Sequence, residues 1–239
     1  MSADTLVFLP ALDEEASLPA VLDELRSELP DVDVVVVDDG SRDRTAAVAR
    51  ERGAEVLTFP ENRGLPVAVA AGYEYAARKH YAFCGRIDAD GQHPAAELRR
   101  LLELVRSGAC DVAVGSRFVS GDGYAPFRYR PSPARRFGTA VLRRALAVRL
   151  GRPFADATSG MYAASAKAFP LLARPYTTGA PEVQGLLRLA DAGLVVEEVP
   201  VDMRERTSGE SRISGKKAVA LVLTVAGTIL LYRRRKGLA

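Results

Sequence analysis

Hydrophobic and polar positions follow two patterns in the first half of the chain. Short apolar runs, rich in β-branched residues and typical of buried strands, lie at 5–10, 32–39, 54–60, 81–87 and 110–116. The segments between them carry apolar residues at helical spacing, at 17–29, 42–53, 65–80 and 94–108. Strand–helix repeats of this length predict a parallel, doubly wound sheet with right-handed crossovers and helices on both faces.

The pattern loosens after Arg117, where we expect loops, helices and a short extension of the sheet at 194–203. Near the C-terminus, an uncharged run from Ala218 to Tyr232 is flanked by basic residues at both ends. As a helix this run would be about 22 Å long, which is short for a hydrocarbon core of about 30 Å. We therefore expect an interfacial helix rather than a membrane span, with packing on the domain or on a partner as the alternative.

Acidic side chains follow three of the predicted strands. The residues concerned are Asp13 and Glu14, Asp38 and Asp39, and Asp88 and Asp90. In a sheet of this kind ligands bind beyond the carboxyl ends of the strands, and carboxylates gathered there repel one another and a phosphate unless a cation lies among them. Mg²⁺ and Mn²⁺ favour carboxylate oxygens and leave positions open for substrate phosphates. The sequence therefore predicts a metal that holds a diphosphate, centred on Asp88 and Asp90.

Composition and charge narrow the choice of partner. The 239 residues are 48% hydrophobic and 26% charged, as in a globular enzyme with one large domain or one domain and an appendage. A net charge of only +3 argues against a nucleic-acid-binding protein. The segment between Asp122 and Asp156 contains no acidic residue but many arginines. This segment predicts an anionic partner, either phosphate groups or a membrane surface, unless it is simply a solvated helix face. Its basic residues are Arg128, Arg130, Arg135, Arg136, Arg143, Arg144, Arg149 and Arg152.

Cysteine and histidine are too scarce for other common chemistries. Cys84 and Cys110 are the only cysteines, which excludes a disulfide framework, and with His80 and His93 as the only histidines a zinc centre is not expected. The first residues have neither a basic region nor a long apolar one, so no signal peptide is expected. These features predict a catalytic domain that works in the cytoplasm.

Seven motifs, in order, resemble those of the glycosyltransferases of family 2, and most closely the polyprenyl-phosphate sugar transferases of the dolichyl-phosphate mannose synthase type. The resemblance covers about residues 5–213. The motifs are "LPALDEE", "VVVDDGSRDRT", "ENRGLPVAVAAGYEYA", "RIDADGQHP", "VGSRF", "DATSGMY" and "VPVDMRERTSGESRIS". Any one of them alone is weak evidence, whereas seven in the family's order are specific.

The resemblance implies a GT-A fold, an α/β architecture, with a catalytic domain at 1–213 and a C-terminal helix with a basic tail at 214–239. It also implies the following residue roles. The metal would be served by Asp88, Asp90 and Gln92; the nucleotide by Pro10, Ala11, Leu12, Glu14, Asp39, Arg63, Asp88 and Ala89; and the acceptor phosphate by Arg117, Arg135, Arg136, Arg206 and Ser211. Two departures from the family pattern, Ala11–Leu12–Asp13 and Leu65–Pro66, leave the base and the sugar contacts open.

The implied reaction is inverting transfer of a hexose from a UDP- or GDP-sugar, assisted by Mg²⁺ or Mn²⁺. A polyprenyl phosphate acceptor is already an anion, so arginine would matter more than a base, and Arg117 and Arg206 are the expected catalytic arginines. A hydroxyl acceptor would instead need a carboxylate base, and Asp156 and Glu182 are the candidates for that task or for positioning the sugar. Asp38 and Asp156 could equally be caps, and Glu182 an acid favoured by a helix N-terminus.

Rival functions fit less well. A haloacid-dehalogenase-type phosphatase would also carry Asp-x-Asp-Gly after a strand, but here that motif lies late in the chain. A nucleotidyltransferase should have a basic, glycine-rich loop after the first strand, where this chain has acids, and a catalytically silent membrane-surface scaffold is the non-enzymatic alternative. The expected partners are the nucleotide sugar, the lipid phosphate and the inner face of the cell membrane, with a membrane protein or a second copy as further possibilities.

Overall fold

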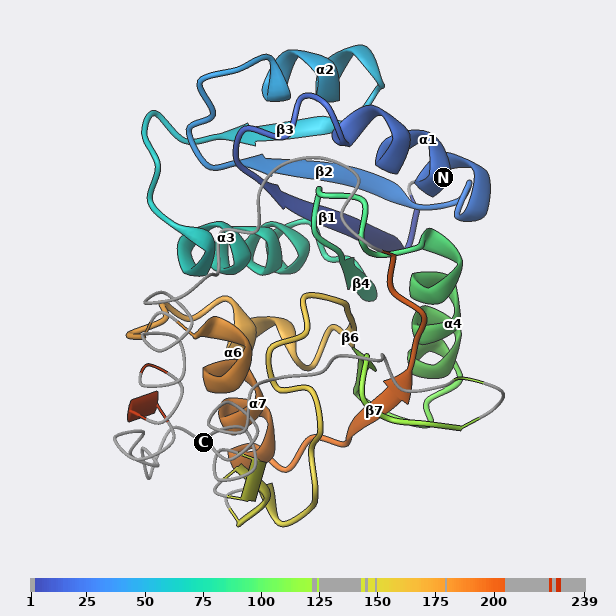
Figure 1. Cartoon of the computed structure of the whole chain (residues 1–239), viewed down its shortest axis with the longest axis vertical. Coiled ribbons are helices and arrows are strands. Elements are labelled where there is room, and N and C mark those ends of the chain that lie inside the picture. The colour runs from blue at the N-terminus through green and yellow to red at the C-terminus, as the bar shows by residue number, and fades with distance from the viewer. Residues whose placement is uncertain are drawn as a thin grey trace.

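The computed structural model describes residues 3–121, 124, 143, 144, 146–148, 150–178, 180–204, 224, 227 and 228. Its helices and strands alternate through the first half of the chain, as the hydrophobic pattern predicts (Figure 1). The strands are β1 (Thr5–Ala11), β2 (Asp33–Asp38), β3 (Glu55–Thr58), β4 (Phe83–Arg86), β5 (Val112–Ser116), β6 (Tyr162–Ser165) and β7 (Val196–Pro200). The helices are α1 (Leu18–Glu28), α2 (Thr45–Glu51), α3 (Leu65–Arg78), α4 (Ala95–Arg106), α6 (Phe169–Leu172) and α7 (Pro181–Asp191).

The described strands form one sheet of seven in the order β3-β2-β1-β4-β6-β5-β7. All neighbours run parallel except β6, which is antiparallel to both β4 and β5. The predicted doubly wound and mostly parallel sheet is therefore confirmed, and the extension expected at 194–203 is β7, which pairs with β5.

Strand side chains point alternately to the two faces of the sheet and build a separate core on each. Leu6 and Phe8 of β1 face α3, α6 and α7. The rings of Phe8 and Tyr73 pack edge-to-face there, with their centroids 4.9 Å apart. Val7 and Leu9 face the opposite way, into a second core that α1, α2 and α4 close. Because β1 is covered on both sides, its residues read as a continuous apolar run.

Strand β6 is the element that the pattern did not predict. Its sequence, Tyr-Ala-Ala-Ser, is short and has neither β-branched residues nor alternation. It becomes a strand because it inserts between β4 and β5, pairing Gly85 with Ala163 on one side and Ala113 with Ala163 on the other. The small residues suit that central position, which only long-range pairing creates.

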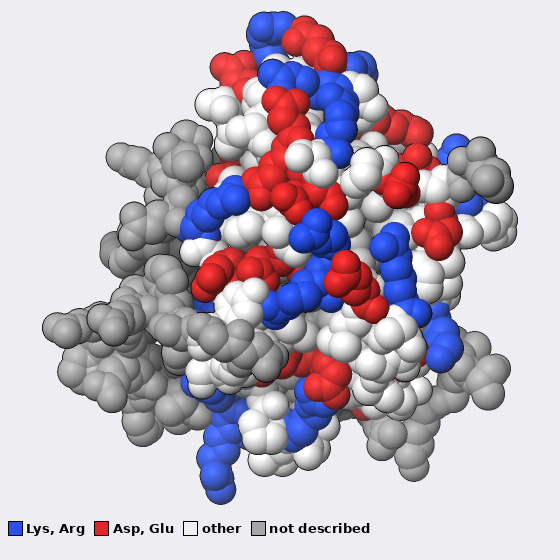
Figure 2. Space-filling model, turned by 90° about the vertical axis from the view of Figure 1, so that its right-hand side faces the viewer, with Lys and Arg blue, Asp and Glu red and all other residues white. Residues whose placement is uncertain are grey.

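Basic and acidic side chains lie next to one another on the face that carries α1 and α4 (Figure 2). Arg99 pairs there with Glu28 at 2.9 Å, and Arg204 pairs with Glu24. Of the arginine block, Arg143 and Arg144 are exposed, Arg152 pairs with Glu197 at 3.1 Å, and the other members lie outside the described residues. The anionic partner predicted for that block stays a prediction.

The C-terminal apolar run lies almost wholly outside the described residues, which include only Thr224, Gly227 and Thr228 of it. Within the described parts of the chain, none of the helices combines the length and the apolar character that a membrane crossing requires. The predicted interfacial helix and the domain boundary near residue 213 stay predictions.

Candidate active site

A cavity of about 400 Å³ opens at the carboxyl ends of β1 and β4. These two strands are neighbours at the point where the order of the sheet reverses, which is where open α/β sheets bind ligands. Seven of the eight predicted nucleotide residues line it, together with Asp90. The lining residues are Pro10, Ala11, Leu12, Glu14, Asp39, Asn62, Gly64, Leu65, Ala68, Asp88, Ala89 and Asp90.

Asp13 after β1 and Asp38 at the end of β2 both hold the backbone of the loop that follows β2. Asp13 has a positive φ of 56°, and its carboxylate accepts the backbone N–H of Arg42 at 2.8 Å. Asp38 accepts the N–H of Ser41 at 3.0 Å, so it is the turn cap that was one of its two interpretations.

Asp39 fixes the third loop of the cavity. Its two carboxylate oxygens accept the backbone N–H groups of Arg63 at 2.8 Å and of Gly64 at 2.9 Å. Asp39 was predicted to bind the nucleotide; the structure places it in the cavity lining, with its carboxylate bonded to the backbone of this loop. Arg63 itself is exposed, with its guanidinium carbon 5.7 Å from the centre of the Phe59 ring, and does not line the cavity.

The Asp-x-Asp turn follows β4 directly and is tightly built. The N–H of Asp88 donates to Nδ1 of His93 at 3.0 Å, and Asp90, which is buried, accepts the N–H of Gln92 at 3.1 Å. Gly91 lies between them with a φ of 79°, a conformation that glycine adopts without strain. The side-chain amide of Gln92 donates to the carbonyl of Arg204 at 3.4 Å, and Gln92 is not part of the cavity lining.

His93 supports the turn as a neutral imidazole. Its Nδ1 accepts a hydrogen bond from Asp88, so that nitrogen carries no proton. Burial lowers the pKa of His93 below its usual value because a buried imidazolium loses its hydration, and this effect outweighs the opposing charges of Asp88 and Asp90. This geometry makes His93 a support for the Asp88 backbone.

Asp88 and Asp90 both line the cavity and could supply two carboxylates to a divalent cation, which would need further ligands. The Asp88 carboxylate packs against Gly160, where an added Cβ would lie 2.4 Å from Oδ2, so the glycine leaves room for it. Within the described ranges, no three His, Cys, Asp or Glu side chains converge in a metal-binding group. Two carboxylates completed by substrate phosphate oxygens are, however, a usual set for Mg²⁺.

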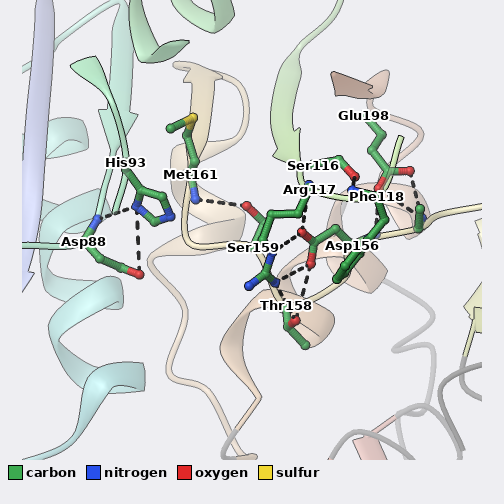
Figure 3. A network of polar contacts seen from close by, with 11 residues as sticks. Asp88, His93, Ser116, Arg117, Phe118, Asp156, Thr158, Ser159, Met161 and Glu198 are labelled. Atoms are coloured by element: carbon green, nitrogen blue, oxygen red, sulfur yellow. Dashed lines mark hydrogen bonds and ion pairs between the residues drawn. The ribbon is translucent and has the colours of Figure 1, made fainter. Parts of the chain in front are cut away.

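Arg117 and Asp156, predicted for different tasks, form one ion pair (Figure 3). Nε and Nη2 of Arg117 each donate to one oxygen of Asp156 at 2.7 Å, and the backbone N–H of Arg117 adds a third bond at 3.1 Å. The Asp156 side chain is fully buried, and its own N–H donates to Glu198 at 2.6 Å. Asp156 is thus a group that orients Arg117, since its oxygens are already taken by donors.

Glu182, the other predicted base, is also engaged. It lies in the first turn of α7, and its Oε1 accepts from Nη2 of Arg86 at 2.9 Å. Arg86 ends β4, and the composition of its strand gave no signal of an ion pair. Four other predicted residues lie outside the described parts of the chain and keep their roles as predictions: Arg135, Arg136, Arg206 and Ser211.

The fold and this site define a GT-A glycosyltransferase: a mixed sheet with a nucleotide-sized cavity at its point of reversal and an Asp-x-Asp turn at the edge of that cavity. The family model described as glycosyl transferase family 2 matches residues 6–169. The chain belongs to that family.

Named relatives agree with this assignment. The chain is 31% identical over 231 residues to polyprenol monophosphomannose synthase of Mycolicibacterium smegmatis, covering 93% of this chain and 85% of the relative. It is 34% identical over 218 residues to undecaprenyl-phosphate mannosyltransferase of Micrococcus luteus, covering 88% and 87%.

Solved structures show the same fold. Glucosyl-3-phosphoglycerate synthase from Mycobacterium tuberculosis, in complex with phosphoglyceric acid, is similar with a TM-score of 0.67 and 25% identity, over 95% of this chain and 79% of that one. Its complex with Mn²⁺, UDP-glucose and phosphoglyceric acid gives a TM-score of 0.69 at 24% identity, over 95% and 78%.

Proposed function

We propose that this glycosyltransferase moves a hexose from a nucleoside diphosphate sugar to a polyprenyl phosphate, with inversion at the anomeric carbon. The observation that carries the donor half is the cavity, because it brings the nucleotide motifs against Asp88 and Asp90. The names of the two relatives support the acceptor half and make mannose the first sugar to test.

The proposed reaction breaks the bond between the anomeric carbon and the diphosphate oxygen and forms one to an oxygen of the acceptor phosphate. The electron pair leaves with the nucleoside diphosphate. When bound, Mg²⁺ or Mn²⁺ supplies Lewis-acid neutralisation of the charge on that leaving group. Asp88 and Asp90 would hold the cation, with His93 fixing the backbone of Asp88.

The state of the carboxylates favours an acceptor that needs no base. A hydroxyl acceptor must lose a proton to a carboxylate, but Asp156 is occupied by Arg117 and Glu182 by Arg86. A phosphate is anionic already. The described contacts of the Arg117 side chain use Nε and Nη2, so the Nη1 side of its guanidinium is left to face an acceptor phosphate.

We place this reaction at the inner face of the cell membrane, where the basic segments and the C-terminal run would meet the lipid. An assay with GDP- and UDP-sugars, Mg²⁺ or Mn²⁺, and polyprenyl phosphate in anionic vesicles tests the whole proposal. A lipid-linked sugar is expected. Transfer to a soluble hydroxyl acceptor alone would contradict the lipid acceptor, release of inorganic phosphate would indicate a phosphatase, and no product with any donor would favour a scaffold.

Gly160→Ala should impair transfer while leaving the fold almost intact. The added methyl group would meet the Asp88 carboxylate at 2.4 Å and push it aside, and a misplacement of this size in an active site costs about a hundredfold in rate. Steady-state transfer rates and a thermal melt check both parts. Gly185→Ala is the matched control, because its methyl group would meet Leu172 Cδ2 at 3.1 Å and the Tyr176 hydroxyl at 3.7 Å, away from Asp88. Equal losses in the two variants would contradict the role given to Gly160.

A further inference from the structure

Arg86 occupies an unusual position behind the Asp-x-Asp turn. It is the last residue of β4, two positions before Asp88, and its side chain is only 3% exposed. A single nitrogen, Nη2, lies 2.9 Å from Oε1 of Glu182 and 3.7 Å from Oδ1 of Asp88. Arg86 is therefore hydrogen-bonded to Glu182 and stands just beyond hydrogen-bond distance from Asp88.

The guanidinium cannot escape this position by losing its charge. Burial lowers the pKa of Arg86, but the charges of Glu182 and Asp88 outweigh burial and hold the pKa above its usual value. Among the described residues its Nε has no hydrogen-bond partner, and its guanidinium carbon lies 6.0 Å from the centre of the Tyr162 ring. A permanent cation with donor capacity to spare thus lies beside a carboxylate that is predicted to bind a metal.

The Asp88 side chain is 37% exposed, but on its protein side it is closely packed. The backbone of Asp88 is held by His93, and Gly160 packs against the carboxylate so closely that even a methyl group there would clash. A cation bound by Asp88 and the guanidinium of Arg86 would therefore compete for the same oxygens. Nη2 of Arg86 and Oδ1 of Asp88 are 3.7 Å apart, so the two charges attract each other even though solvent partly screens the Asp88 side chain.

We propose that Glu182 is a positioning residue that holds Arg86 and so leaves Asp88 available to the divalent cation. This inference rests on the proposed metal site at Asp88 and Asp90. Without the negative charge of Glu182, Nη2 of Arg86 would turn to Asp88 and form a charge-assisted hydrogen bond with its carboxylate. The divalent cation would then bind to Asp88 less tightly. Glu182 thereby acts on the metal through Arg86, from a helix that begins almost a hundred residues further along the chain.

The test compares the Mn²⁺ affinity of a set of variants, measured by electron paramagnetic resonance. Each protein is titrated without a sugar donor, first with Mn²⁺ alone and then with Mn²⁺ together with UDP or GDP. Glu182→Gln keeps the shape but removes the charge, and we expect its Mn²⁺ affinity to fall about tenfold. Adding Arg86→Met should restore the affinity, because the competing guanidinium is gone. Arg86→Met alone should bind Mn²⁺ at least as tightly as the wild type, and it carries the test if E182Q does not fold.

Two controls separate this proposal from its neighbours. Glu97→Gln removes an acid from the first turn of α4, where Glu97 pairs with Arg100 at 3.5 Å, and should leave Mn²⁺ affinity unchanged. Asp88→Asn should abolish Mn²⁺ binding.

If D88N loses Mn²⁺ while E182Q binds it normally, Glu182 merely ties α7 to the sheet and this proposal is overturned, although the metal site stands. If the double variant stays as weak as E182Q, competition by Arg86 is likewise overturned. If the wild type binds no Mn²⁺ under any of these conditions, the metal assignment fails and this inference fails with it.

Discussion

Asp90→Asn lowers sugar transfer by at least about a thousandfold in our expectation, with little change in stability. Asp90 is buried at the edge of the cavity, and its Oδ1 accepts the N–H of Gln92. Asparagine keeps a carbonyl oxygen for that turn and loses only the negative charge. The charge is what a divalent cation needs, so the effect should appear in kcat and in Mn²⁺ affinity rather than in the melting temperature.

Asp38→Asn is the matched control for that experiment. Asp38 is also a buried strand-end aspartate that accepts a backbone N–H, from Ser41, but it does not line the cavity. Its replacement should leave transfer within about threefold of the wild type, since a neutral cap replaces a charged one at modest cost. Near-full turnover by D90N, or equal losses in D90N and D38N, would refute the metal site at the Asp-x-Asp turn.

Arg117→Ala is expected to lower the free energy of unfolding by about 3–5 kcal/mol, because it leaves a fully buried carboxylate without its partner. That carboxylate belongs to Asp156, which takes two side-chain bonds and one backbone bond from Arg117. Denaturant unfolding measures the loss. Arg152→Ala is the control, because its pair with Glu197 is 40% and 43% exposed and should contribute less than about 1 kcal/mol.

The same variant tests the acceptor site. Below its unfolding temperature, R117A should raise the KM for polyprenyl phosphate while leaving the KM for the sugar donor near the wild-type value, because Arg117 faces the acceptor in our proposal. Arg117→Lys keeps the charge but cannot bridge two oxygens, so its KM for polyprenyl phosphate should lie between those of the wild type and R117A. If R117A has the same free energy of unfolding as the wild type, or if it loses affinity for the sugar donor alone, the role given to Arg117 is contradicted.

Several parts of the site could be predicted because the signal was local. Asp88 and Asp90 follow an apolar strand at a glycine turn, and strand ends in a parallel sheet meet at one edge. The residues predicted for the nucleotide therefore line one cavity, apart from Arg63. The function of the acids in the other two loops was less clear from the sequence, because Asp13 and Asp38 both accept backbone N–H groups of the loop that follows β2.

Other parts depend on partners that are far away in the chain. Asp156 and Glu182 were predicted as candidate bases for a hydroxyl acceptor, or as residues that position the sugar. Their partners Arg117 and Arg86 lie 39 and 96 residues away. No periodicity records such a pairing, so it was not predicted. The same holds for β6, whose residues have no strand preference of their own and are ordered by the strands on either side.

By itself the sequence determined the class of fold, the layers around the sheet and the edge of the sheet that carries the candidate site, because apolar runs and strand-end acids are local features of the sequence. The tertiary structure alone decided which carboxylates are engaged by arginines and which face the cavity. That division has a physical reason: a side chain's charge belongs to its residue, but its availability depends on which opposite charge the fold brings within about 3 Å of it.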